Sequence, residues 1–91
     1  MSVQITIIGL CQVGSSIGLA LAGQKSIHRV GHDKDHKTAR LAQKAGAVDE
    51  VRINLPSSVK DANLVLLCIP LSGIRETLDF IARDLDRKSV V

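Results

Sequence analysis

The residues whose types and spacing could do chemistry lie in one glycine-containing segment near the N-terminus. Gly9, Cys11 and Gly14 follow directly on an apolar run that covers residues 5–8. Where a strand leads through a glycine turn into a helix, the first backbone N–H groups of that helix have no partners within it. These groups and the positive end of the helix dipole bind anions. The segment therefore predicts a site for the pyrophosphate of a dinucleotide.

A carboxylate further along the chain extends this pattern. The dinucleotide-binding fingerprint is G-x-G-x-x-G, followed about 20 residues later by an acidic side chain that binds the ribose hydroxyls. Asp33 stands at about that distance, but Cys11 replaces the middle glycine, whose role is to let the backbone approach the pyrophosphate. Two interpretations stay open. Either the cysteine weakens a dinucleotide site, or the glycines serve only the packing of a strand–turn–helix.

The elements that must position these residues are those of one small domain. A chain of 91 residues forms one domain, and its 45% hydrophobic content is enough for a core. Phe80 is the only aromatic residue. We therefore expect an aliphatic core of the kind found in parallel α/β sheets.

Strand and helix signals alternate along the whole chain. Asp35 and Ser72 are expected to cap helices at their N-termini, and Gly23 and Gly46 to end helices. The hydrophobic pattern predicts strands over 3–8, 27–32, 48–53 and 63–69, helices over 12–22 and 38–45 and after Ser72, one helical turn at 56–58, and the start of a strand at 88–91.

This alternation predicts an α/β fold, a truncated Rossmann-like sheet that is doubly wound, parallel and right-handed. In such sheets the ligand lies beyond the carboxyl ends of the strands, at the point where the strand order reverses. We therefore expect residues 9–14, Asp33 and residues 68–72 to converge at one crevice.

Charge and hydropathy exclude several other classes of function. The chain has 12 Lys and Arg against 9 Asp and Glu, and this mild excess without interleaved aromatic residues predicts no nucleic-acid binding. Residues 3–22 are apolar, but Gln4, Gln12 and Ser15 interrupt them and no positive segment precedes them. We therefore expect neither a signal peptide nor a membrane span.

The cysteines and histidines carry little signal of their own. Cys11 and Cys68 lack metal-ligand spacing, so they are expected to be reduced thiols of a cytoplasmic protein, and no metal site is predicted. Both follow strands that should be neighbours, which brings them within reach of one another without predicting a disulfide. His28, His32 and His36 are expected to be solvated surface side chains.

Five segments of the chain together form a family pattern: residues 5–10, 14–16, 30–33, 45–50 and 62–71. The Gly-Ala-Val-Asp-Glu run at 46–50 is its most specific part. In these segments the chain resembles the N-terminal nucleotide-binding domain of prephenate dehydrogenases, and the resemblance covers almost all of the chain. Reductases similar to 6-phosphogluconate dehydrogenase match the glycine loop but less of the remainder.

This resemblance implies NAD(P)-dependent oxidative decarboxylation of prephenate or arogenate, in tyrosine synthesis. It implies that Asp33 binds the adenosine ribose. The pyrophosphate turn would contain Gly9, Leu10, Cys11, Gln12, Val13 and Gly14, and the nicotinamide half would lie near Ile69, Pro70 and Leu71. The chain departs from the family pattern at Cys11, which bears on cofactor affinity, and at Ser15, which makes the first helical turn more polar.

The charges near Asp33 predict which of NAD and NADP the site prefers. Asp33 can accept both ribose hydroxyls but repels the 2′-phosphate of NADP. Lys34 and Lys37 are close enough in sequence to offset part of this repulsion, although they also fit an ordinary charged helix face. NAD is therefore predicted in preference to NADP.

The catalytic histidine and the dimerising helical domain of such enzymes follow the segment that these residues match. We therefore expect a single domain over 1–91, part of a longer enzyme, without catalytic residues and inactive alone; prephenate or arogenate would bind only with the remainder. One alternative is a nucleotide-binding or interaction module with a degenerate glycine loop. Another is pairing of an open sheet edge with another chain, as in a homo-oligomer.

Overall fold

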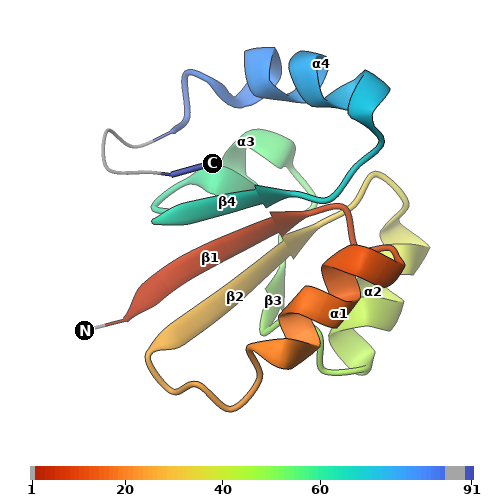
Figure 1. Ribbon diagram of the computed structural model, residues 1–91, viewed down its shortest axis with the longest axis vertical. Helices are drawn as coiled ribbons and strands as arrows, with labels where there is room; N and C mark the ends of the chain where they lie inside the picture. Colours follow the sequence, from red (N-terminus) through yellow and green to blue (C-terminus); the bar gives the residue numbers. More distant parts are fainter. Residues whose placement is uncertain (1, 86–89) are drawn as a thin grey trace.

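Strands and helices alternate along the chain in the computed structural model, which describes residues 2–85 and 90–91 (Figure 1). The elements are β1 (Val3–Ile8), α1 (Gln12–Ala20), β2 (Ile27–His32), α2 (His36–Lys44), β3 (Glu50–Val51), α3 (Leu55–Val59), β4 (Leu64–Leu67) and α4 (Leu71–Ile81). None of the helices within these residues is long and apolar enough to cross a membrane.

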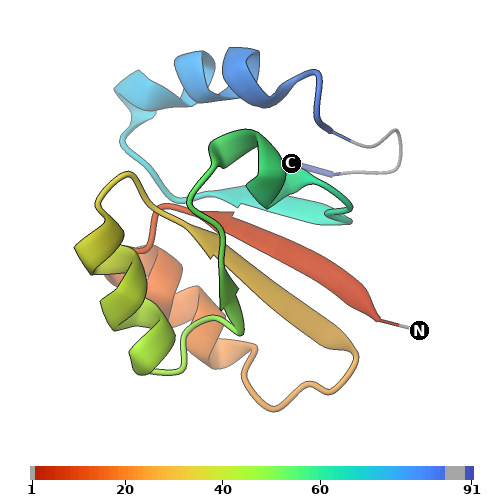
Figure 2. The same ribbon diagram turned by 180° about the vertical axis from the view of Figure 1, so that it is seen from behind.

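The strands form one sheet in the order β3-β2-β1-β4, and every neighbouring pair is parallel. Helices α1 and α2 lie on one face, and α3 and α4 lie on the other (Figures 1 and 2). The chain thus steps outward from β1 to β3 and returns to the other side of β1 for β4. The Rossmann-like, doubly wound parallel sheet expected from the sequence is confirmed, and its order reverses between β1 and β4.

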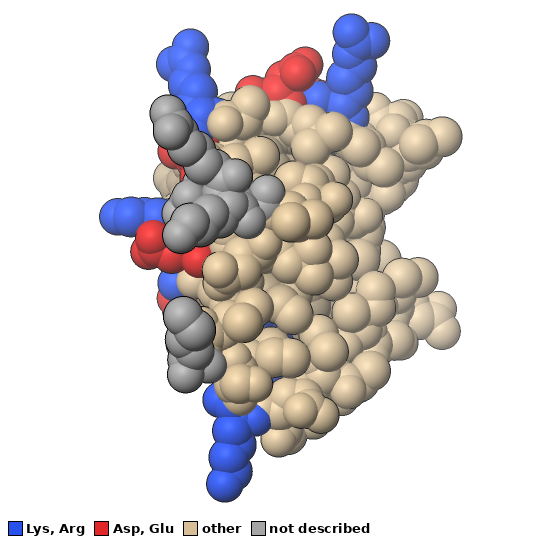
Figure 3. Space-filling view, turned by 60° about the vertical axis from the view of Figure 1, so that its left-hand side comes forward, with Lys and Arg blue, Asp and Glu red and all other residues tan. Residues whose placement is uncertain are grey.

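An aliphatic core fills both sides of the sheet. Ile7 is fully buried among side chains of α1 and α2, and Val65 is fully buried against α3 and α4. Phe80 remains 62% exposed and contributes to neither cluster. On the face shown in Figure 3, Lys and Arg side chains project singly from the edges, so the positive net charge is not gathered into one patch there.

Two glycines let α1 contact neighbouring backbone directly. A Cβ atom added at Gly14 would lie 1.9 Å from the carbonyl oxygen of Gly9, and one added at Gly18 would lie 2.0 Å from that of Ala47. Gly9 itself has a φ of 98°, which side-chain-bearing residues rarely adopt. A residue with a Cβ atom at position 14 or 18 would overlap these carbonyl groups. The two glycines therefore allow α1 to lie closer to the sheet edge than other residues would.

Arg29 of β2 joins the other end of α1 to the sheet and forms an ion pair with Asp49. The Arg29 guanidinium is almost fully buried and donates to the carbonyl oxygens of Gly18 (2.9 Å) and Gly46 (2.7 Å), as well as to the Asp49 carboxylate. Hydrogen bonds from Arg29 lower the pKa of Asp49. The Gly-Ala-Val-Asp-Glu run therefore has a structural role: its aspartate compensates a buried cation.

Some of the predicted boundaries of strands and helices agree with the structure, and others differ from it. Strands β1 and β2 have the predicted bounds, and the helical turn around Pro56 is present as α3. Asp35 caps α2 by accepting from the N–H groups of Lys37 and Thr38. Helix α1 ends at Ala20 rather than at residue 22, and α2 runs over residues 36–44 instead of 38–45.

Three predictions are wrong in detail. Strand β3 covers two residues rather than 48–53, because Val48 is buried in the core before pairing begins and only Glu50 and Val51 pair with β2. Strand β4 covers 64–67 rather than 63–69. Ser72 is not a cap, because α4 already begins at Leu71 with Pro70 in the N-cap position and no side-chain cap.

Two of the four residues of the predicted strand at 88–91 lie outside the described residues. Val90 forms a parallel bridge with Leu64, its N–H donating to the carbonyl of Asn63 and its carbonyl accepting from Val65. Residues 86–89 lie outside the described part of the chain.

We expect Gly18→Ala to destabilise the domain by about 1–3 kcal/mol, because the added methyl group would overlap the carbonyl of Ala47. The matched control is Gly73→Ala in α4, where the nearest atom would be 3.8 Å away. There the substitution should stabilise by roughly 0.5–1 kcal/mol through helix propensity. Urea unfolding of both variants measures the difference, and equal effects would contradict the close approach of α1.

Stability should fall in acid partly through Glu50. Hydrogen bonds from Arg52 and His28 lower its pKa from 4.5 to about 2, so its stabilising effect is complete above 4.5 and is lost as pH falls toward 2. Its side chain is 41% exposed, so solvent screening keeps the effect small. In Glu50→Gln, the free energy of unfolding should decline less steeply over this range; a curve parallel to the wild type would contradict the assignment.

Candidate functional site

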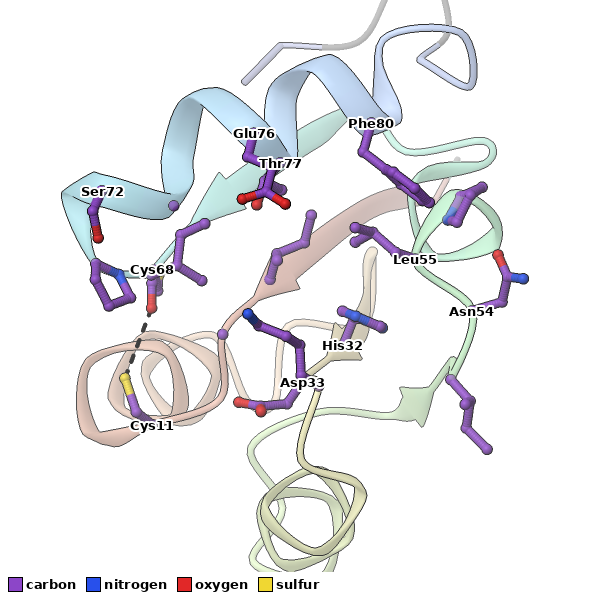
Figure 4. A pocket seen from close by; sticks show the side chains of 18 residues that line it. Cys11, His32, Asp33, Asn54, Leu55, Cys68, Ser72, Glu76, Thr77 and Phe80 are labelled. Atoms are coloured by element: carbon purple, nitrogen blue, oxygen red, sulfur yellow. Dashed lines mark hydrogen bonds between the residues drawn. The ribbon is translucent and has the colours of Figure 1, made fainter.

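A cavity of about 730 Å³ lies beyond the carboxyl ends of the strands, at the point where the strand order reverses (Figure 4). In parallel sheets this is where ligands bind. Its walls come from four parts of the chain. The lining residues are Ile8, Gly9 and Cys11; His32, Asp33 and Lys34; Ile53, Asn54, Leu55 and Pro56; and Cys68, Ile69, Pro70, Ser72, Gly73, Glu76, Thr77 and Phe80.

The three segments that we expected from the sequence to converge lie together in the structure. Gly9, Cys11, Asp33, Ile69 and Pro70 all line this one cavity. They come from the turns after β1, β2 and β4, so the parallel pairing of these strands is what collects them.

Five other candidates lie off the cavity wall. Leu10 is 3% exposed and packs in the core, while Gly14 is buried where α1 meets Gly9. Gln12 and Val13 are exposed in the first turn of α1, and Leu71 is 85% exposed. Of these five, Gln12, Val13 and Gly14 can still contribute backbone N–H groups, because they form the first turn of α1.

Asp33 points toward the turn that begins at Gly9. One carboxylate oxygen accepts from the N–H of Leu10 at 2.8 Å, and the other accepts from the N–H of Asp35 at 2.9 Å. The N–H of Gly9 donates to the carbonyl of His32 at 2.8 Å. The turn after β1 is therefore held against the end of β2, with a carboxylate at their junction.

Cys11 lies at the start of α1 without capping the helix through its side chain. Its thiol is exposed and donates to the carbonyl oxygen of Cys68 at 3.7 Å (Figure 4). Both cysteines are free thiols, and burial raises the pKa of Cys68. A sulfur atom thus occupies the side of the cavity next to the N-terminus of α1.

The histidines differ from expectation at one position. His32 is 6% exposed rather than solvated, because it ends the central strand β2, and its Nδ1 lies 3.0 Å from the carbonyl oxygen of Arg52. His28 lies 2.9 Å from Glu50 with its side chain 43% exposed, and His36 is exposed. His32 therefore forms part of the cavity wall.

The sequence did not indicate the walls that come from α3 and α4. Asn54, Leu55 and Pro56 follow β3, so the rule that ligands lie beyond the carboxyl ends of strands could have indicated them. Phe80 and Thr77 belong to the body of α4, whose position over the cavity depends on tertiary packing. Within the described residues, no cluster of three or more His, Cys, Asp or Glu is placed to hold a metal ion.

Comparison with known proteins agrees with this geometry. Residues 4–91 match the model of the family described as NADP oxidoreductase, coenzyme F420-dependent. The chain belongs to this family. It is also 32% identical over 80 residues to a prephenate dehydrogenase of Lactococcus lactis subsp. cremoris (strain MG1363), an alignment that covers 87% of this chain and 22% of that relative.

Solved structures of similar fold include two dehydrogenases of the expected kind. Synechocystis arogenate dehydrogenase superposes with a TM-score of 0.88 at 25% identity, over 97% of this chain and 31% of that one. Prephenate dehydrogenase from A. aeolicus, solved with hydroxyphenyl propionate and NAD+, superposes with a TM-score of 0.85 at 20% identity, over 98% and 32%. The resemblance to prephenate dehydrogenases is confirmed. The chain spans less than a third of the length of each of these three relatives.

Cys11 should react with iodoacetamide before Cys68 in the folded protein at neutral pH. Cys11 is exposed, whereas Cys68 is half-buried and burial raises its pKa. Peptide mapping by mass spectrometry after partial alkylation measures the order, and both thiols should react alike in urea. Equal rates in the folded protein would contradict the placement of Cys68.

Proposed function

We propose that the chain binds a nicotinamide dinucleotide in the cavity at the carboxyl edge of the sheet. One observation carries the proposal: the first turn of α1, the Asp33 carboxylate and the segment after β4 meet around one space. The uncapped N–H groups at the start of α1 fit a pyrophosphate, because they combine free donors with the positive end of the helix dipole. Asp33 fits the hydroxyl groups of the adenosine ribose.

The preferred dinucleotide in this proposal is NAD. The Asp33 carboxylate would lie next to the ribose and repel a 2′-phosphate. Lys34 also lines the cavity, and its ammonium group offsets part of this repulsion. Because Asp33 is held in place by the N–H groups of Leu10 and Asp35, it cannot turn away from a phosphate without losing both hydrogen bonds.

Within the same proposal, the domain is the cofactor-binding part of a longer dehydrogenase that acts on prephenate or arogenate. The likeness to the Lactococcus lactis and Synechocystis enzymes supports this assignment. The domain would hold the nicotinamide as hydride acceptor, and substrate would be bound with residues beyond those of this chain. A cytoplasmic location fits its two free thiols, since cytosolic thiols stay reduced.

A second candidate is a nucleotide-binding module without chemistry. The observation that favours it is Cys11, whose side chain lies in the cavity where the fingerprint has glycine. In this view the sulfur hinders the pyrophosphate, and the fold is retained for binding or for interaction with another protein.

Titration calorimetry with NAD and NADP tests the first proposal. We expect saturable binding of NAD and weaker binding of NADP. Asp33→Asn keeps the size of the side chain but removes its charge, so the Kd for NAD should rise about tenfold, and the preference over NADP should shrink. Asp79→Asn, an exposed position on α4 away from the cavity, is the matched control. No heat of binding at millimolar NAD would contradict the proposal.

Cys11→Gly measures how much the sulfur hinders NAD, and together with the wild type it separates the two candidates. If the sulfur only narrows a dinucleotide site, the wild type binds NAD and the variant should bind it about tenfold more tightly. If the sulfur closes the site, NAD binding should be absent from the wild type and appear in the variant, and an unchanged titration would show that the sulfur does not hinder the pyrophosphate. Thermal unfolding of the same variant checks that the fold is retained.

A further inference from the structure

The two cysteines of the chain both line the cavity and lie next to one another (Figure 4). Cys11 is the N-cap residue of α1, and Cys68 directly follows β4. Strands β1 and β4 pair so that Ile8 lies beside Leu67, and the N–H of Cys68 donates to the carbonyl of Ile8 at 2.8 Å. The pairing of these two strands therefore fixes the position of one thiol relative to the other.

Their side chains lie on the same face of the sheet. Leu64, Leu66 and Cys68 pack against the core cluster beneath α1 and α2, as expected for alternate residues of one strand. Cys11 begins α1 on that face, and its Sγ reaches to 3.7 Å from the Cys68 carbonyl oxygen. Burial raises the pKa of Cys68, and the two thiols are near enough for Cys11 to contribute to this rise.

The surroundings of the two thiols differ in a way that suits sequential oxidation. Cys11 is exposed in the cavity, where a small oxidant can reach it. Cys68 is half-buried, and both burial and the nearby Cys11 raise its pKa. Exposure favours oxidation of Cys11 before Cys68, and a neighbouring thiol can then condense with the sulfenic acid to a disulfide.

We propose that Cys11 and Cys68 form a peroxide-sensitive dithiol, and that its disulfide obstructs the cavity. The second half rests on the proposed dinucleotide binding. The Cys11 sulfur attacks one oxygen of the peroxide, the O–O bond breaks, and one water leaves with Cys11 as a sulfenic acid. The Cys68 sulfur then attacks the Cys11 sulfur and displaces a second water. Two thiols thus lose two electrons and two protons, and one hydrogen peroxide becomes two waters.

The disulfide acts on the cavity through the backbone of the turn. Cys11 stands between Gly9, which lines the cavity, and the first-turn N–H groups of α1. A covalent bond to Cys68 would tie this turn to the end of β4 and place both sulfurs across the pyrophosphate position. Oxidation therefore converts an open anion site into a closed one without unfolding the sheet.

The test treats the folded chain with a slight excess of hydrogen peroxide and measures free thiols, intact mass and NAD affinity. We expect both thiols to disappear with the loss of two hydrogen atoms, and a non-reducing peptide map to join Cys11 to Cys68. The NAD affinity of the oxidised chain should be about tenfold lower or more and should recover with dithiothreitol. In Cys11→Ser, peroxide should leave the affinity unchanged, and in Cys68→Ser, it should add an oxygen to Cys11 instead.

Retention of the Cys68 thiol while Cys11 gains oxygen atoms in the wild type would overturn the dithiol. A disulfide that leaves NAD affinity unchanged would overturn the obstruction. Thiol count and mass need no cofactor, so a failure of the reduced chain to bind NAD would count against the proposed function alone.

Discussion

Direct backbone contact between α1 and its neighbours is the constraint on which the rest of the structure depends. Gly14 lies against the carbonyl of Gly9, and Gly18 lies against that of Ala47, at distances that leave no room for a Cβ atom. This approach places the first-turn N–H groups of α1 at the carboxyl edge of the sheet, where β1 and β4 meet. The packing of these glycines is therefore what positions the N–H groups to which we propose that a pyrophosphate binds.

The sequence predicted the parts of the fold that depend on local signals. Strands β1 and β2 have their predicted bounds because both are central strands of the sheet. Residues 5–8 of β1 and 29–32 of β2 are buried. The Asp35 cap depends on hydrogen bonds to the next few residues. Strand β3 differs, because Val48 is buried in the core before pairing begins and only Glu50 and Val51 pair with β2. Ser72 differs too, because α4 already begins at Leu71 with Pro70 in the N-cap position.

Long-range contacts account for what the sequence did not indicate. The Arg29–Asp49 ion pair joins β2 to the loop before β3. Asp49 belongs to the Gly-Ala-Val-Asp-Glu run, and the sequence of that run did not indicate the ion pair. His32 is buried by its place in a central strand, although histidines on average favour neither surface nor core. The cavity walls from α3 and α4 depend on how these helices pack across the sheet. The site segments were predictable because they follow strands, whereas their enclosure was not.

In the proposed complex, a dinucleotide lies over the start of α1 and beside Asp33. Amide NMR of the isotope-labelled chain, titrated with NAD, tests it directly, because each residue reports separately. We expect the largest shifts at the N–H groups of Gln12, Val13 and Gly14, together with Asp33 and Ile69. Saturating NAD that shifts only amides outside the cavity, such as those at the C-terminal end of α2, would contradict it.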